Sequence, residues 1–304
     1  MNAAALPRKA KVICLGVATL DQIFRVDHIP PAPAKLRATE FIVTGGGMAA
    51  NAAVAVQRLG GDAQYWGRVG DDDVGDQIIR LLKLEHVNVD HVHRLAGSRS
   101  KTAAILVDAR GERLVCSAPS QGYPPDTSWL PLDEVKRADA VHADSRWKPG
   151  AIALFDAACA ANIPSVFDAD AGDPKEVLTI SHRATHSAFS EPMLTSLGWG
   201  PPRIALRRAF GGNNVMCGVT LGERGMMWFD GAAVRHLPAR AIKSIDTLAA
   251  GDTWHGALAL ALAERQPLQQ ALQFATAAAS IKCSRFGGRV GIPNRAETDA
   301  LISS

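Results

Sequence analysis

The sequence predicts an α/β protein: a three-layer αβα sandwich with a mostly parallel central sheet and a small β-sheet lid. Short, continuously apolar runs alternate with helical stretches, which is typical of βαβ units in a parallel sheet. Two segments with strand character, 38–44 and 102–118, lack a helical crossover, so we expect them in a separate small sheet. The length of 304 residues suits one large domain with such an addition.

The elements follow in order from the N-terminus. The apolar strand KVICLG runs into a loop at Gly16, and glycines after the strand at 38–44 lead into an alanine-rich helix. QYWGRVG predicts a strand, and DDDVGDQIIRLLKLE a helix with an acidic start. Turn signals at 109–111 and 230–231 predict two hairpins. Short strands are expected in ADAVHAD, IPSVFDAD, ATHSAFS and NNVMCGVT, and helices near 150–162, 172–181, 190–210, 252–264, 267–284 and 295–302.

Composition excludes several classes of protein. The formal net charge is +3 and no basic run stands out, so we expect neither a nucleic-acid nor a membrane partner. The first twelve residues contain no apolar segment of the kind found in secretory signals. The five cysteines are odd in number and lack CxxC spacing, which favours reduced thiols and a cytoplasmic protein.

The segment DTLAAGDTWHG, residues 246–256, carries the clearest functional signal. We expect a strand-like approach at Ile242–Ile245, then a turn of small residues, then an apolar helix. The first N–H groups of a helix lack partners and carry the positive end of the dipole, so a bare helix start binds anions such as phosphate. Asp252 at this start is a candidate general base, although an aspartate there is equally a helix N-cap.

This segment resembles the C-terminal signature D-T-x-G-A-G-D of the PfkB/ribokinase family of sugar kinases, with Ala249 where the family usually has glycine. The resemblance implies that Asp252 is the catalytic base. It also implies that the amides of Ala250, Gly251 and Asp252 hold the transferring phosphoryl group. If position 249 needs a positive φ, the Cβ of Ala249 costs on the order of 1 kcal/mol.

A second motif, GGGMAANAAVAVQRLG at 45–60, is similar to the N-terminal signature of the same family. The resemblance implies that Gly46 and Gly47 form a lid hinge, and that Asn51 and Asp21 bind sugar hydroxyls. Taken alone, the glycines also suit close helix packing, and Asp21 also suits a turn.

Further motifs match the nucleotide side of the family. TLGERG resembles the nucleotide loop, with Thr220, Gly222 and Gly225, although alone it fits a plain turn. The resemblance places Glu191 near the usual N-x-x-E motif, but Ser190-Glu191-Pro192-Met193 departs from that motif, so the Mg²⁺ ligands stay unassigned. It also implies that Ala249 and Gly287 border the nucleotide, and that a monovalent cation such as K⁺ binds near Asp246.

The sequences of three segments, ADSRW, AFSEP and GGRVGIP, resemble those of the sulfofructose kinase branch. That branch phosphorylates a ketose whose C6 carries a sulfonate, and the resemblance places Lys35 and Arg146 at this anionic end. Ser117 stands where the branch has an asparagine. Solvated surface charges are the alternative for Lys35 and Arg146. A ribokinase- or fructokinase-type kinase of a neutral sugar, a nucleoside kinase and a non-catalytic sugar-sensing protein are the alternative functions.

The resemblance covers residues 11–295 with its motifs in order. It implies one kinase domain, 1–304, with a lid formed by about 19–45 and 98–120. It also implies ATP and Mg²⁺ as cofactors and a homodimer through the lid. Neither GxxxxGK[ST] nor a GxGxxG after the first strand occurs, which excludes a Walker-type ATPase and a dinucleotide-dependent dehydrogenase.

Overall fold

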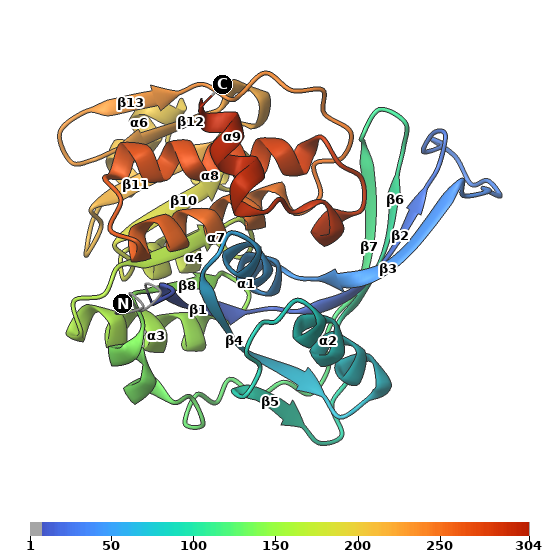
Figure 1. Ribbon diagram of the computed structural model, residues 1–304, viewed down its shortest axis with the longest axis horizontal. Helices are drawn as coiled ribbons and strands as arrows, with labels where there is room; N and C mark the ends of the chain where they lie inside the picture. Colours follow the sequence, from blue (N-terminus) through green and yellow to red (C-terminus); the bar gives the residue numbers. More distant parts are fainter. Residues whose placement is uncertain (1–7, 304) are drawn as a thin grey trace, which may run out of the picture.

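The computed structural model describes residues 8–303, in which a large sheet lies between helices and a smaller sheet projects from one side (Figure 1). In these residues the large sheet has nine strands, in the order β13-β12-β11-β10-β9-β8-β1-β4-β5. The strands from β5 to β11 in this order are parallel, and β12 and β13 are antiparallel. Their bounds are β1 Lys11–Gly16, β4 Asp62–Gly70, β5 Val92–Leu95, β8 Ala140–Asp144, β9 Ser165–Ala169, β10 His186–Ser190, β11 Met216–Thr220, β12 Met226–Phe229 and β13 Val234–Leu237.

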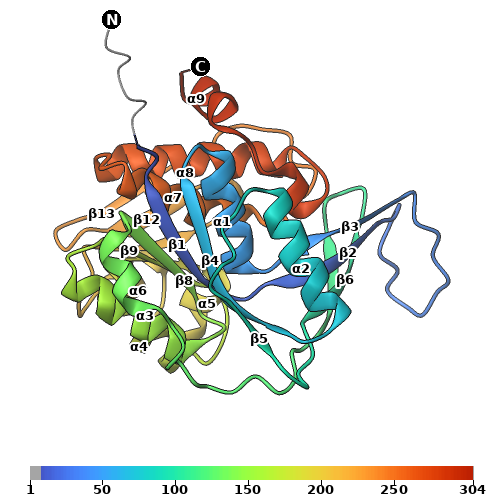
Figure 2. The ribbon, with the colours of Figure 1, turned by 60° about the horizontal axis from the view of Figure 1, so that its bottom comes forward.

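Helices cover both faces of this sheet because its strands are apolar on both sides (Figure 2). In β1, Val12 and Cys14 belong to one buried cluster, whereas Ile13 and Leu15 belong to the other. The first cluster contains α1 Met48–Arg58, α2 Asp73–Leu84, α7 Ala250–Ala263 and α8 Leu268–Cys283. The second contains α3 Lys148–Ala160, α4 Pro174–Ser181, α5 Glu191–Ser196 and α6 Pro202–Ala209. The last helix, α9 Arg295–Ser303, packs on α8. The predicted fold class is therefore confirmed.

The smaller sheet has the order β3-β2-β6-β7. Its strands are β2 Thr19–Arg25, β3 Glu40–Gly46, β6 Thr102–Val107 and β7 Arg113–Ala118. On the face toward the body, Ile23 and Ile105 are buried. Leu248 and Phe286, from the C-terminal part of the chain, pack against them. This contact fixes one face of the small sheet over the start of α7.

Two local expectations were wrong, and two strands were not predicted. The chain does not stay in a loop after Gly16 but enters β2, the centre of the lid, three residues later. The short strand β5 was not predicted. Ile242–Ile245 is not a strand, although the Ile245 amide donates to the Cys283 carbonyl over 2.7 Å. The helix expected at 190–210 is divided into α5 and α6, because Gly198, Gly200 and Pro201 interrupt it.

Within residues 8–303, no helix is both long enough and apolar enough to span a membrane.

Candidate active site

The candidate site lies where the carboxyl ends of β1 and β8 meet the lid and the starts of α1 and α7. Asp144, the last residue of β8, is fully buried and organises this edge. Its Oδ2 accepts hydrogen bonds from the amides of Val17 at 2.8 Å and Ala49 at 3.1 Å, and its Oδ1 accepts from the Arg146 amide at 2.9 Å. One carboxylate therefore holds three backbone segments together.

Asp252 lies in the first turn of α7 and is half-buried. The Asn51 amide Nδ2, from the first turn of α1, donates to Asp252 Oδ2 over 2.6 Å. Arg289 holds the other end of this amide, since its Nε donates to Asn51 Oδ1 over 2.8 Å. A second arm of Arg289, Nη2, donates to the Gly46 carbonyl over 3.0 Å. The predicted base and the predicted sugar-binding asparagine are thus joined in one chain of contacts.

The pKa of Asp252 is raised to about 7, chiefly by burial. The hydrogen bond from Asn51 opposes this rise, whereas the negative charges of Asp170, Asp144 and Asp21 add to it. A carboxylate with a pKa near neutrality is matched to accept a proton at physiological pH, which an ordinary aspartate does poorly. Within residues 8–303, no side-chain capping bond is formed at this helix start, so Asp252 does not act as a plain N-cap, and its role as general base stays a prediction.

The start of α7 is open to an anion. Ala249 precedes the helix with a φ of 65°, so the left-handed conformation considered from the sequence is present, at a cost on the order of 1 kcal/mol. Within residues 8–303, the amides of Gly251 and Asp252 have no hydrogen-bond partner, and Gly251 is exposed. The Ala250 amide donates to the Thr247 carbonyl over 3.2 Å, so only two of the three predicted amides are free.

Asp21 and the glycine pair lie on the lid side of the same site. Asp21, on β2, is buried and accepts from the Thr19 hydroxyl over 2.6 Å, and burial raises its pKa. A Cβ at Gly46 would lie 1.9 Å from Asp21 Oδ2, so any larger residue there would displace the Asp21 carboxylate. Gly47 has a φ of 92°, and a Cβ there would lie 2.5 Å from the Val17 carbonyl oxygen. Both glycines are required for this packing, and their role as a hinge stays a prediction.

The turn before α7 contains a buried ion pair at the place where the sequence suggested a monovalent cation. Lys282 Nζ lies 3.2 Å from Asp246 Oδ2, and neither side chain is exposed. Burial lowers the pKa of Lys282, and the charge of Asp246 opposes this. The amides of Gly287 and Gly288 also donate to Asp246 Oδ2, over 3.0 and 3.1 Å. The Gly287 amide therefore donates to Asp246, and the contact of Gly287 with a nucleotide stays a prediction.

The residues predicted to hold the nucleotide form a second group beside the sheet edge. Thr220 ends β11 and pairs in register with Ser190, which precedes Glu191. Gly222 and Gly225 have φ values of 60° and 82° in the turn that follows β11. Arg224, in the same turn, binds the Glu191 carboxylate at 2.6 and 2.5 Å. Glu191 and the TLGERG loop are therefore brought together.

The two cations predicted at the far end of the sugar, Lys35 and Arg146, are both exposed. Arg146 is exposed beside Asp144, and its charge lowers the pKa of Lys101 after the larger effect of burial. Lys35 is exposed in the loop between β2 and β3, and its role at the anionic end of the sugar stays a prediction. Ser117 is exposed but pairs in register with Ala103, which pairs with Asp21, so Ser117 and Asp21 face the same side of the lid.

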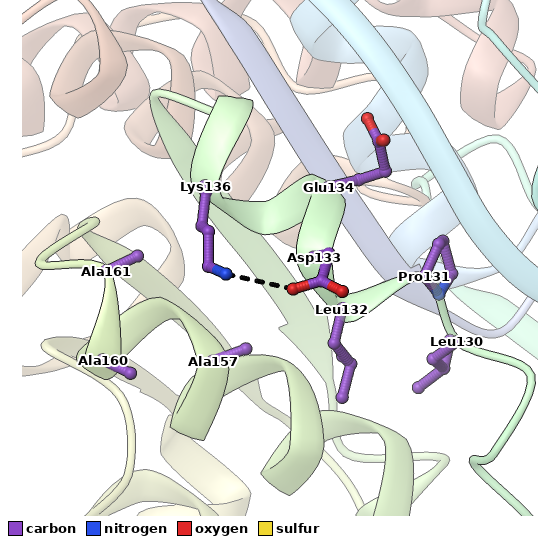
Figure 3. Close-up of a pocket in the computed structure, with 9 residues that line it drawn as sticks. All are labelled: Leu130, Pro131, Leu132, Asp133, Glu134, Lys136, Ala157, Ala160 and Ala161. Carbon is purple, nitrogen blue, oxygen red and sulfur yellow. Dashed lines mark hydrogen bonds and ion pairs between the residues drawn. The ribbon is translucent and has the colours of Figure 1, made fainter.

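A separate pocket of about 500 Å³ lies between the turn that contains Leu132 and helix α3 (Figure 3). Its charged lining includes Asp133 and Lys136, whose side chains bind each other at 3.0 Å, and the half-buried Glu134. Ala157, Ala160 and Ala161 line the opposite wall. None of the candidate catalytic or sugar-binding residues lines this pocket, so it does not belong to the site.

Comparison with known proteins identifies the family. The profile of pfkB family carbohydrate kinases matches residues 9–295. The chain belongs to the pfkB family of carbohydrate kinases. This pfkB kinase is 29% identical to the ribokinase of Bacillus subtilis, over 96% of this chain and 99% of that protein. It is 26% identical to a probable fructokinase-4 of Arabidopsis thaliana, over 99% of both proteins.

Solved structures agree with this assignment. A candidate ribokinase from Agrobacterium tumefaciens has a TM-score of 0.92 and 34% identity, with 98% of each chain covered. The ribokinase of Arabidopsis thaliana, solved with ribose and ATP, has the same fold at a TM-score of 0.82 and 23% identity, with 98% of this chain and 100% of that chain covered. The pfkB kinase is therefore a sugar kinase of the ribokinase and fructokinase family, which transfers phosphate to a hydroxyl group.

Sequence reasoning missed four residues that shape the site of this pfkB kinase: Asp144, Lys101, Lys282 and Arg289. Asp144 was detectable as a polar residue at the end of an apolar strand, and Arg289 as a charge inside a glycine-rich run. Lys101 and Lys282 gave no comparable signal, because each looks like an ordinary surface lysine in the sequence. Their positions depend on tertiary packing.

The raised pKa of Asp252 predicts a pH dependence of the phosphoryl transfer. Below about pH 7 the carboxyl group holds a proton and cannot act as a base, so kcat/KM for the sugar should fall about tenfold per pH unit as pH decreases from 7 to 5. Initial rates at saturating MgATP, in buffers of constant ionic strength, measure this. A profile that stays flat down to pH 5 would contradict the assignment of Asp252 as the titrating base.

Proposed function

We propose that the protein is an ATP- and Mg²⁺-dependent kinase that phosphorylates the primary hydroxyl of an anionic, fructose-like ketose. The main support for phosphoryl transfer lies at the start of α7, where two amides without hydrogen-bond partners lie beside a carboxylate whose pKa is raised to about 7. Such a pair can accept the hydroxyl proton and stabilise the charge that develops on the phosphoryl group.

Each residue of the site has a distinct role in this proposal. Asp252 accepts the proton from the sugar hydroxyl, whose oxygen then attacks the γ-phosphoryl group of ATP in line. The amides of Gly251 and Asp252 hold the phosphoryl oxygens. Asp21 and Asn51 bind sugar hydroxyls, and Arg289 orients Asn51 through its hydrogen bond. The lid excludes water that would otherwise hydrolyse ATP.

The nucleotide is proposed to lie against Thr220, Gly222 and Gly225. Complexes of Arabidopsis ribokinase with ribose and ATP, and of Cryptococcus neoformans ribokinase with ADP, support ATP as the donor. Mg²⁺ usually binds through substrate phosphates and one or two carboxylates. Asp170, which is exposed after β9, and Glu191 are the carboxylates that fit this role, and the ion would neutralise charge on the transferring phosphate.

Two cations support an anionic substrate. Lys101 is half-buried, and burial lowers its pKa. The positive charge of Arg146 lowers the pKa of Lys101 further, so the two cations lie close enough to repel each other. Within residues 8–303, neither side chain forms an ion pair with a carboxylate. Both lie near Asp144, and Lys101 also lies near Asp21, the proposed sugar ligand. An anionic group at the far end of the sugar would relieve this repulsion.

A sugar panel tests the proposal. ATP turnover should be measured with ribose, fructose, 6-deoxy-6-sulfofructose, fructose 6-phosphate and inosine, in the wild type and in Arg146→Ala. We expect the highest kcat/KM with one of the anionic ketoses. Loss of a charged hydrogen bond costs roughly 2–5 kcal/mol, so Arg146→Ala should lower kcat/KM for that sugar at least about tenfold. Fructose, which has no anionic group, should change little.

The same panel separates the alternatives. Preference for inosine would indicate a nucleoside kinase. The absence of ATP turnover with every sugar would indicate a non-catalytic sugar-sensing protein. Equal losses for the anionic sugar and fructose in Arg146→Ala would mean that Arg146 supports the fold rather than the anionic end. Lys175→Ala serves as a control for charge, because Lys175 is exposed on α4 and has no predicted role in the site, whereas Lys35→Ala tests the second predicted cation.

The outer face of the lid supports a homodimer. Phe41, Phe24, Leu106 and Leu114 form one row in register across all four strands. Phe41 is 53% exposed, Leu114 is 52% exposed, and Val43 in the next row is 45% exposed. A contiguous apolar surface of this kind is typical of a protein interface, and a second copy of the same lid is complementary to it.

The dimer is tested by changing this row. Phe41→Lys combined with Leu114→Lys should convert a dimer into a monomer, because two charges would be buried at the interface. Light scattering after size-exclusion chromatography measures the mass. Leu84→Lys, which places the same change on an exposed leucine at the end of α2, should leave the dimer intact. A wild-type monomer at high protein concentration would contradict the proposal.

A further inference from the structure

Lys282 is a fully buried lysine whose ammonium group lies inside the turn that leads to α7. Nζ donates to the Asp246 carbonyl over 2.8 Å and to the Arg285 carbonyl over 3.1 Å, and it lies 3.2 Å from Asp246 Oδ2. An ammonium group has three N–H donors, and here three oxygen atoms face it. Its hydrogen-bonding capacity is therefore filled by the protein.

The same three oxygen atoms are the kind that hold a monovalent cation, since two are backbone carbonyls and one is a carboxylate. The sequence resemblance implied such an ion near Asp246. These residues do not fit an exchangeable ion, because the ammonium already contacts every one of these oxygens. A second positive charge at contact distance from Nζ would also be repelled strongly in this buried place.

We propose that Lys282 is a built-in replacement for an activating monovalent cation, so that this kinase is independent of K⁺. The ammonium balances the charge of the buried Asp246, while both carboxylate oxygens accept hydrogen bonds from backbone amides. Oδ1 accepts from the Leu248 amide over 2.8 Å, and Oδ2 accepts from Gly287 and Gly288. The turn that carries Leu248 leads directly into Ala249 and the anion-binding start of α7.

The lid contacts this same turn. The Arg113 guanidinium of β7 donates to the Thr247 hydroxyl over 2.5 Å. Gly111, at the tip of the β6–β7 hairpin, approaches the Ile245 carbonyl so closely that a Cβ would lie 2.9 Å from its oxygen. Lys282 is thus a positioning residue: it is fully buried and fixes the turn that joins the lid to the helix start.

The wild-type protein provides the first test. Melting temperature and turnover should be compared in potassium, ammonium and tetramethylammonium chloride at equal concentration. A cation that binds the folded state raises the melting temperature by mass action, so we expect no difference between these salts. We expect turnover to change by less than about twofold, since no site depends on a bound cation. Activation by K⁺ of about fivefold or more, together with a higher melting temperature in K⁺, would overturn the proposal.

Lys282→Ala provides the second test. It leaves a buried, uncompensated Asp246, so in tetramethylammonium chloride the melting temperature should fall on the order of 10 °C. Potassium or ammonium ions should enter the vacated space and restore part of the loss. Lys282→Met fills that space with apolar atoms and should not be restored. Lys243→Ala removes an exposed lysine three residues before Asp246 and should match the wild type in every salt.

The melting temperature does not depend on the proposed function, whereas turnover does. In turnover, we expect Lys282→Ala to lose at least about tenfold without K⁺ and to become K⁺-activated, because the helix start loses its anchor. Equal melting temperatures of Lys282→Ala in potassium and tetramethylammonium would overturn the proposal even if no sugar is ever phosphorylated. If Lys282→Ala fails to fold in every salt, the salt response of the wild type and of Lys282→Met decides the question.

Discussion

The site depends on one electrostatic constraint: Asp252 must stay free of any cation while it lies at the positive end of α7. A bound cation would lower its pKa and weaken it as a base. Two buried cations, Arg289 and Lys282, bind other groups. Arg289 binds Asn51 and the Gly46 carbonyl, and Lys282 binds Asp246. Within residues 8–303, the one side chain that donates to the Asp252 carboxylate is the neutral Asn51 amide, and burial raises the pKa of Asp252 to about 7.

A second feature of the site is the use of buried carboxylates as organisers of backbone. Asp144 accepts from amides at the end of β1, at the start of α1 and after β8. Asp246 does the same for the turn before α7 and the glycine run after α8. Loops at a sheet edge have few apolar contacts, so charged acceptors give them a defined geometry. The negative charge of Asp144 also contributes to the raised pKa of Asp252.

Local patterns in the sequence predicted much of this arrangement. The alternation of apolar runs and helices predicted the parallel sheet, and turn residues predicted both hairpins. The helix start at Asp252 was recognisable because small residues and an acidic residue precede an apolar helix. Strand β2 was missed because its polar residues, such as Asp21 and Gln22, mask the alternation of a lid strand that buries only one face.

Partners distant in the sequence could not be predicted. Arg289 and Asn51 are 238 residues apart, and no local pattern relates them. Lys282 has the appearance of a helix C-terminal lysine, which usually lies in solvent, yet it is fully buried. The loop between β2 and β3 extends away from the body with the lid (Figure 1), and no local pattern shows what it would contact. These outcomes depend on how the lid and the C-terminal helices pack together.

The most direct measurement of the central claim is the turnover of Asp252→Asn. Asparagine keeps the size of the side chain and can accept the hydrogen bond from Asn51, but it cannot take a proton from the sugar. The account predicts that kcat falls roughly 10²–10⁴-fold, while the melting temperature is not lowered and ATP still binds. A folded Asp252→Asn enzyme with a kcat close to that of the wild type would contradict the account.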